Sequence, residues 1–151
     1  MIFNFTVSGT EEQIVQFERE LLEILTRITG DQDMVAHEIH FCIHEAILNI
    51  LQHSYCWKKD LPIDVKLIVS GSDESKDKVL EIQIKDTGPA IQKPLEPPEK
   101  IDRFQMRKRG IYMISKIMDE FTVRYDGKSG NITYMKKSLS RLDDQILNIS
   151  V

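Results

Sequence analysis

Five short stretches of the chain alternate apolar and polar residues. This period of two is typical of strands that bury one face. The stretches are residues 2–7, 63–69, 79–85, 121–125 and 132–137. A polar segment separates the second stretch from the third, and another separates the fourth from the fifth, so each of these pairs predicts a hairpin.

Three other stretches repeat apolar residues at helical spacing. The first follows Ser8-Gly9-Thr10, which is an N-cap signal with acidic residues after it, and ends at Gly30. The second runs from about Met34 to about Trp57 and is apolar nearly all round. The third covers residues 110–120. Between the last two, residues 92–109 contain three prolines and are predicted to form a loop or lid.

The predicted order is β-α-α-β-β-α-β-β. Such an order is typical of an α+β fold, a two-layer sandwich with helices packed on one face of a mixed, largely antiparallel sheet. We expect residues 1–151 to form a single domain with its core at about 5–138. The pattern assigns no role to residues 139–151.

Charge and composition narrow the function classes. The chain has 20 basic and 24 acidic residues and a net charge of −4, so no direct binding of nucleic acid or of an anionic membrane is expected. No apolar run approaches the ~20 residues of a membrane span, and no signal peptide is apparent. Cys42 and Cys56 are too far apart on one helix for a disulfide, which favours free buried thiols and a cytoplasmic location.

A polar stripe interrupts the second predicted helix. Glu45, Asn49 and His53 are spaced four residues apart and therefore share a helix face. Burying such groups is costly unless they are paired, so they form either an internal network or the lining of a ligand pocket. In a pocket, the Asn49 carbonyl suits Mg²⁺, and Glu45 can orient or deprotonate a nucleophile.

Two other short motifs are candidate ligand sites. Asp86-Thr87-Gly88 follows a predicted strand and is either an ordinary turn or a site where a carboxylate accepts a hydrogen bond from a base. Arg107-Lys108-Arg109-Gly110 opens the third helix and is either a solvated basic turn or a phosphate site. No Walker loop is present.

Three histidines, His37, His40 and His44, lie on another stripe of the second helix. A structural metal site is conceivable there, but no cysteine or acidic pattern completes it. We therefore interpret these histidines as solvent-facing or packed side chains.

Taken together, four motifs resemble those of the GHKL (histidine-kinase-like, or Bergerat) ATPase superfamily. Residues 44–55 resemble its N box, in the Glu-Ala-x-x-Asn-x-x-x-His-x-Tyr form of the anti-sigma factor serine kinases. Residues 86–91 are similar to the G1 box, and residues 109–120 to the G2 helix. Residues 130–137 look like the closing strand of the fold. The resemblance covers about residues 5–138.

The resemblance implies a role for each candidate residue. Asn49 would ligate Mg²⁺, and Glu45 would act as general base toward an acceptor serine. The other implied ATP-binding residues are His53 behind the pocket, Asp86 at the adenine amino group, Gly88 beneath the ring, Thr133 backing the adenine, and Lys108, Arg109 and Gly110 at the phosphates.

The glycine-rich part of the lid departs from the family pattern. Lys108 stands where the family has its first glycine and Tyr112 where it has its last. Losing glycines stiffens a lid, and the lysine adds a positive charge near the expected phosphates.

The resemblance also implies an activity and partners. The chain would be an ATP- and Mg²⁺-dependent serine/threonine protein kinase and anti-sigma factor that phosphorylates an anti-sigma-factor antagonist. Its partners would be a sigma factor and that antagonist, and it would form a homodimer through its first strand and first helix. The alternative is a non-catalytic regulatory module of the same fold that binds nucleotide or a protein. A sensor histidine kinase would need an additional dimerising hairpin, and a gyrase relative a second domain.

Overall fold

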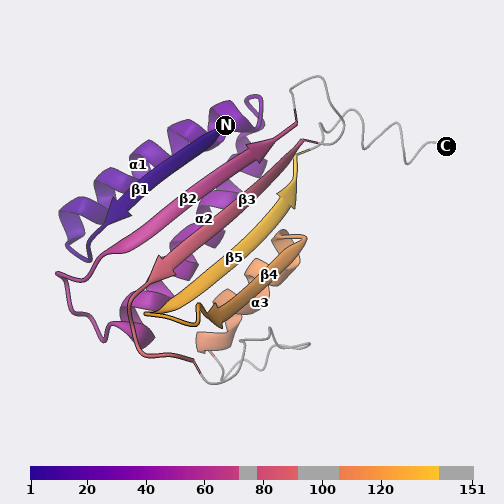
Figure 1. The fold of residues 1–151 in the computed structure, drawn as a ribbon. Coiled ribbons are helices and arrows are strands. Elements are labelled where there is room, and N and C mark those ends of the chain that lie inside the picture. The colour runs from indigo at the N-terminus through magenta and orange to yellow at the C-terminus, as the bar shows by residue number, and fades with distance from the viewer. Residues whose placement is uncertain (72–77, 92–105, 140–151) are drawn as a thin grey trace.

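A computed structural model describes residues 1–71, 78–91 and 106–139, in which one sheet lies against a layer of helices (Figure 1). The elements are β1 (Ile2–Val7), α1 (Glu11–Ile28), α2 (Asp33–Asn49), the π-helical turn η1 (Ile50–Ser54), β2 (Ile63–Ser70), β3 (Val79–Asp86), α3 (Met106–Ile117), β4 (Glu120–Tyr125) and β5 (Asn131–Ser138). Residues 92–105 of the predicted lid and residues 140–151 of the tail lie outside the described residues.

The five strands form one sheet in the order β1-β2-β3-β5-β4, and every neighbouring pair is antiparallel. The sequence predicted a mixed, largely antiparallel sheet, and all four strand pairings in the described residues are antiparallel. Two hairpins, β2–β3 and β4–β5, meet where β3 pairs with β5, and this pairing sets Asp86 opposite Asn131. The end of one hairpin thus lies beside the start of a strand from the other.

The helices cover one face of the sheet, which confirms the predicted α+β class (Figure 1). Along β2 the buried and exposed residues alternate, as a strand with one covered face requires. Helix α1 faces the sheet with a single apolar stripe, made by Phe17, Leu21, Leu25 and Ile28. It begins where the sequence predicted, with the Thr10 hydroxyl accepting a hydrogen bond from the Gln13 N–H.

The second helix differs from its prediction. We expected one α-helix to about Trp57, but α2 ends at Asn49 and η1 follows, with the Tyr55 N–H bonded to the Ile50 carbonyl at 2.8 Å. Cys56 and Trp57 then have φ angles of 48° and 63°, which end the helix. Each residue added to an α-helical turn rotates the following side chains by about 100°, so the π turn re-aims Ser54 and Tyr55.

Helix α3 also differs from its prediction, because it begins at Met106 rather than Gly110 and ends at Ile117. The basic residues before Gly110 are therefore inside its first turns. The helix stops early because Asp119 already donates its N–H to the Lys136 carbonyl, and Glu120 begins β4.

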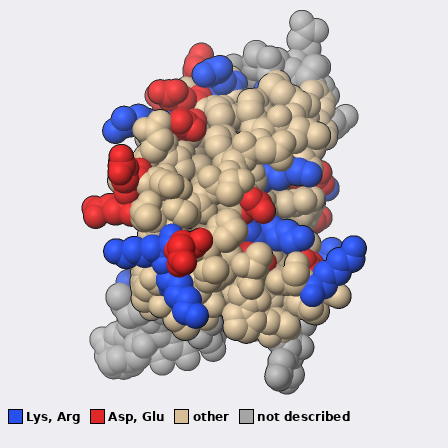
Figure 2. Space-filling view, turned by 60° about the vertical axis from the view of Figure 1, so that its left-hand side comes forward, with Lys and Arg blue, Asp and Glu red and all other residues tan. Residues whose placement is uncertain are grey.

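The surface of the described residues carries both signs of charge. Figure 2 shows Lys and Arg side chains lying among Asp and Glu around an uncharged area on one side of the molecule. Within the described ranges, no helix is both long enough and apolar enough to cross a membrane.

The two cysteines are free, but only Cys42 is buried, so the expectation of two buried thiols is wrong for Cys56. Cys56 has a positive φ angle and therefore lies outside the helix that was expected to contain it. Burial raises the pKa of the Cys42 thiol to about 12, an effect that Lys137 partly opposes.

We expect one thiol per folded chain to react quickly with a colorimetric thiol reagent at pH 8, and the second only after unfolding. The thiolate is the reacting form, and the raised pKa keeps Cys42 protonated in the folded protein. A Cys56→Ser variant should lose the fast reaction. Two fast thiols in the folded wild type would contradict the burial of Cys42.

Candidate functional site

A cavity of about 310 Å³ lies between the end of α2 with η1, the inner face of the sheet, the loop after β3 and the start of α3. Four predicted site residues line it: Asn49, His53, Asp86 and Thr133. Apolar side chains form most of the rest, including Ile50, Ile91, Ile111, Phe121 and Val123. An apolar pocket with a few converging polar groups is the usual form of a small-molecule site.

Asp86 is the most buried charged group of this cavity, with only 2% of its surface exposed. Its Oδ1 atom accepts three hydrogen bonds: from Ser54 Oγ at 3.0 Å, from the Gly88 N–H at 2.9 Å and from Asn131 Nδ2 at 3.2 Å. Its Oδ2 atom accepts no hydrogen bond from the described part of the chain. One carboxylate oxygen is thus held by the protein, and the other can accept from a ligand.

Gly88 is required by the close approach of its loop to η1. A Cβ atom at this position would lie 1.8 Å from Ser54 Oγ and 3.1 Å from Asp86 Oδ1. Gly88 does not itself line the cavity. Its observed role is to let the loop pack against Ser54 and to donate its N–H to Asp86.

Glu45 and Gly110 lie together between α2 and α3. A Cβ atom at Gly110 would be 2.5 Å from Glu45 Oε2, so the glycine leaves room for the half-buried carboxylate to lie against the backbone of α3. Glu45 is one helical turn before Asn49, yet it is not among the residues that line the cavity. The structure therefore places it beside the cavity.

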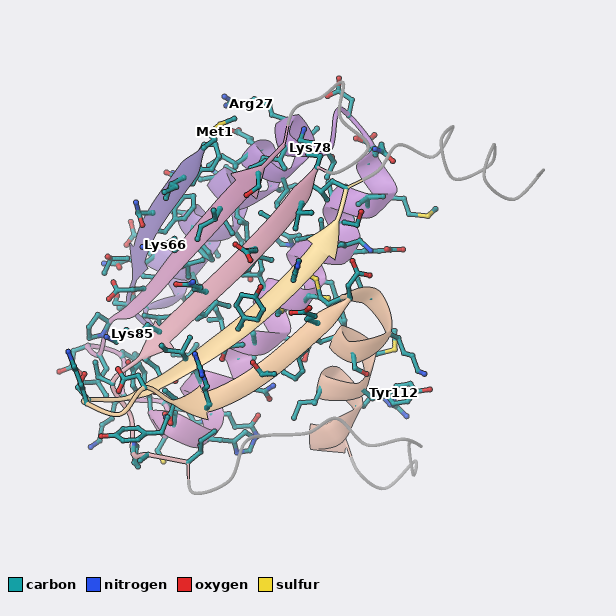
Figure 3. The ribbon with its side chains drawn as sticks, turned by 45° about the vertical axis from the view of Figure 1, so that its right-hand side comes forward. Met1, Arg27, Lys66, Lys78, Lys85 and Tyr112 are labelled. Carbon is teal, nitrogen blue, oxygen red and sulfur yellow. The ribbon has the colours of Figure 1, made fainter. Side chains whose placement is uncertain are left out.

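The predicted phosphate residues at the start of α3 are only partly described. The Lys108 side chain lies outside the described part of the structure. Arg109 is exposed and does not line the cavity. Tyr112, which replaces a family glycine, projects from α3 away from the sheet, with Lys116 Nζ 5.2 Å from its ring centroid (Figure 3). Its bulk therefore does not fill the cavity.

Asn131 is a site residue that the sequence reasoning missed. Its Nδ2 donates to Asp86 Oδ1 and, at 2.8 Å, to the Pro89 carbonyl, while its Oδ1 accepts the Ile91 N–H at 3.0 Å. The sequence did contain a sign of its importance. Asn131 and Thr133 are two residues apart on one strand, so their side chains point to the same face of the sheet. A polar side chain on the buried face needs a hydrogen-bond partner.

Ser54 and Tyr55 lie in the stretch that resembles the N box, but the sequence assigned them no role, since their contacts depend on the π turn. The Tyr55 hydroxyl accepts the Thr87 N–H at 2.8 Å and donates to the Pro62 carbonyl. Tyr55 is 1% exposed and so ties the loop after β3 to the segment that leads into β2.

The histidine stripe of α2 packs against α1. His40 Nε2 lies 3.1 Å from the Glu18 carbonyl oxygen, and His44 Nδ1 bonds the Glu18 carboxylate. His37 contacts the Asp33 carbonyl of its own helix. Among the described residues no group of three or more His, Cys, Asp or Glu side chains could hold a metal.

Comparison with known protein families gives this geometry a context. The model of the histidine kinase-like ATPase domain matches residues 7–137. The chain belongs to this family. No curated protein sequence matches it. Membership makes the chain an ATPase- or kinase-type domain with an ATP-binding fold, in which Mg²⁺ typically accompanies the nucleotide.

The cavity residues fit such a ligand. Asp86 Oδ2 is available to a hydrogen-bond donor in a cavity that is lined mostly by apolar side chains, as an adenine ring would require. The Asn49 amide at the same cavity is a neutral oxygen ligand of the kind that Mg²⁺ accepts.

An Asp86→Asn variant should bind ATP at least about tenfold more weakly. The NH₂ group of the new amide would replace one of the two carboxylate oxygens. It would then face either the three protein donors or the amino group of the ligand, and neither can accept a hydrogen bond from it. Calorimetric titration with Mg·ATP measures this. Asp64→Asn is the matched control, since Asp64 is an exposed strand aspartate that lies outside the cavity lining and accepts a hydrogen bond from Thr6 Oγ1. Equal affinity in Asp86→Asn and wild type would remove Asp86 from the nucleotide site.

Proposed function

We propose that this protein is an ATP-dependent serine/threonine protein kinase and anti-sigma factor of a partner-switching system. The observation that carries the proposal is the convergence of Asn49 and Asp86 on one cavity, with Glu45 one turn away. The N-box form shared with the anti-sigma factor serine kinases supports the choice of branch.

In the proposed mechanism, Asp86 Oδ2 accepts a hydrogen bond from the adenine amino group, and the apolar walls hold the ring. Asn49 would contribute a ligand to Mg²⁺, which neutralises charge on the phosphates when it is bound. Glu45 orients the acceptor serine and takes its proton as the serine oxygen bonds to the γ-phosphorus and the bond to the ADP oxygen breaks.

Phosphate binding is assigned to the start of α3. Arg109 is exposed there, and Gly110 lets α3 approach the end of α2. Lys108 would add a second positive charge. The free N–H groups and dipole at a helix start favour the same anion.

The proposed partners are a sigma factor and its anti-sigma-factor antagonist, and the proposed assembly is a homodimer. The position of β1 at one edge of the sheet supports the dimer, because only one side of this strand is paired in the described chain. Helix α1 packs behind that edge through Phe17. The ring centroids of Phe17 and Phe5 are 5.2 Å apart.

A second candidate function is a regulatory module that binds nucleotide without catalysis. It is favoured by the position of Glu45, whose carboxylate lies against α3 at Gly110 and outside the cavity lining. In this case the cavity would serve binding alone. Catalysis would require Glu45 to leave α3 when substrate binds.

Three variants distinguish the two candidates. Glu45→Ala should keep ATP affinity and lose phosphate transfer about 10²- to 10⁴-fold, the usual contribution of a general base. Asn49→Ala should weaken Mg·ATP binding. Glu38→Ala, two turns earlier on α2, is the control for helix stability. The measurement is phosphoserine on candidate antagonist proteins, followed by mass spectrometry.

Equal transfer rates in wild type and Glu45→Ala would exclude Glu45 as the base. ATP binding without transfer to any antagonist would favour the non-catalytic module. No ATP binding at millimolar concentration would exclude both candidates.

A further inference from the structure

We propose that Asn131 and Ser54 are positioning residues that make the site selective for a nucleobase with an exocyclic amino group. They do so by holding Asp86 with one oxygen toward the protein and the other toward the ligand. The proposal rests on the nucleotide site proposed above and goes beyond it, because it assigns specificity to two residues for which the resemblance implied no role.

The Asn131 amide can adopt only one orientation. Its two amide hydrogens are used by Asp86 Oδ1, at 3.2 Å, and by the Pro89 carbonyl, at 2.8 Å. Its oxygen is used by the Ile91 N–H, at 3.0 Å. A flipped amide would place oxygen against two acceptors and NH₂ against a donor. Asn131 therefore always presents a donor to Asp86.

Ser54 approaches the same carboxylate oxygen from the opposite layer. Its hydroxyl lies 3.0 Å from Asp86 Oδ1 and comes from η1, whereas Asn131 comes from β5. With the Gly88 N–H, these donors supply three hydrogen bonds to Oδ1. A carboxylate held by groups from two sides of the cavity cannot rotate about its terminal bond without breaking them.

The backbone beside Asn131 keeps the two strands close. A Cβ atom at Gly130 would lie 1.8 Å from the Asp86 carbonyl oxygen, so β5 can pack against Asp86 only with glycine at this position. Asp86 and Asn131 are direct partners in the β3–β5 register. The spacing between amide and carboxylate is thus fixed by the sheet.

The selectivity for an amino group follows from Asp86 Oδ2, the carboxylate oxygen that the protein does not hold. Asp86 Oδ2 offers only acceptor lone pairs to a ligand, so an amino group is attracted and a carbonyl oxygen in its place is repelled. A fixed carboxylate cannot turn or shift to accommodate the carbonyl. If either holding residue is lost, Asp86 can reorient, and the penalty against a carbonyl falls.

ATP and ITP are the appropriate probes, because the amino group of ATP is replaced by a carbonyl oxygen in ITP. Their Kd values are measured by calorimetry on the full chain for wild type, Asn131→Ala and Ser54→Ala. We expect wild type to prefer ATP, and the ratio of the two Kd values to fall about tenfold in each variant, the effect of one hydrogen bond to a charged group.

Ser115→Ala is the matched control, since the Ser115 hydroxyl bonds the Tyr112 carbonyl within α3 and lies outside the cavity lining. Its ratio should equal that of wild type. A residue that only supports the fold would weaken ATP and ITP equally, so an unchanged ratio in a folded variant would overturn the inference. If Asn131→Ala does not fold, Ser54→Ala decides the question.

The failure of this inference differs from that of the proposed function. Wild type that binds neither nucleotide would exclude the ATP site itself. Wild type that prefers ATP, together with variants that keep this preference, would leave the ATP site in place and exclude only the assignment of Asn131 and Ser54.

Discussion

A carboxylate buried at the end of the central strand β3 is the constraint on which the arrangement of this site depends. Taking such a group out of water costs several kcal/mol unless hydrogen bonds replace its hydration. In this protein the replacement donors come from η1, from the loop after β3 and from β5. These three segments must therefore occupy their places together, and the cavity is the space that remains between them.

The end of the second helix shows how the chain meets this constraint. An α-helix continued through Ser54 would direct its hydroxyl elsewhere, whereas the π turn brings it to Asp86 and brings the Tyr55 hydroxyl to Thr87. Two consecutive positive φ angles follow, at Cys56 and Trp57, a conformation that side chains other than glycine adopt at a cost. The hydrogen bonds of Ser54 and Tyr55 offset that local strain.

Much of the fold could be predicted from the sequence because its signals are local. The alternation of apolar and polar residues predicted the strands, and the N-cap at Thr10 predicted the start of α1. Four motifs in order indicated the family, which the match over residues 7–137 confirms. The roles assigned to individual site residues stay predictions.

The errors have physical causes. A π turn has the same apolar composition as an α-helix, so periodicity could not show that α2 ends at Asn49. The basic residues before Gly110 looked like a loop but have adequate helix propensity, and α3 includes them. For Asn131 the strand pattern indicated an inward polar side chain, but it could not identify the partner, because Asp86 lies 45 residues away on another strand.

The separation of these two strands in the sequence has a consequence for biosynthesis. While the chain is emerging from the ribosome, α2, η1 and β3 are available before β5 has been made, and the Asp86 carboxylate then lacks its cross-strand partner. A nascent or C-terminally truncated chain could not form the complete cavity. A ligand bound in this cavity would therefore stabilise only chains in which β5 has already paired with β3.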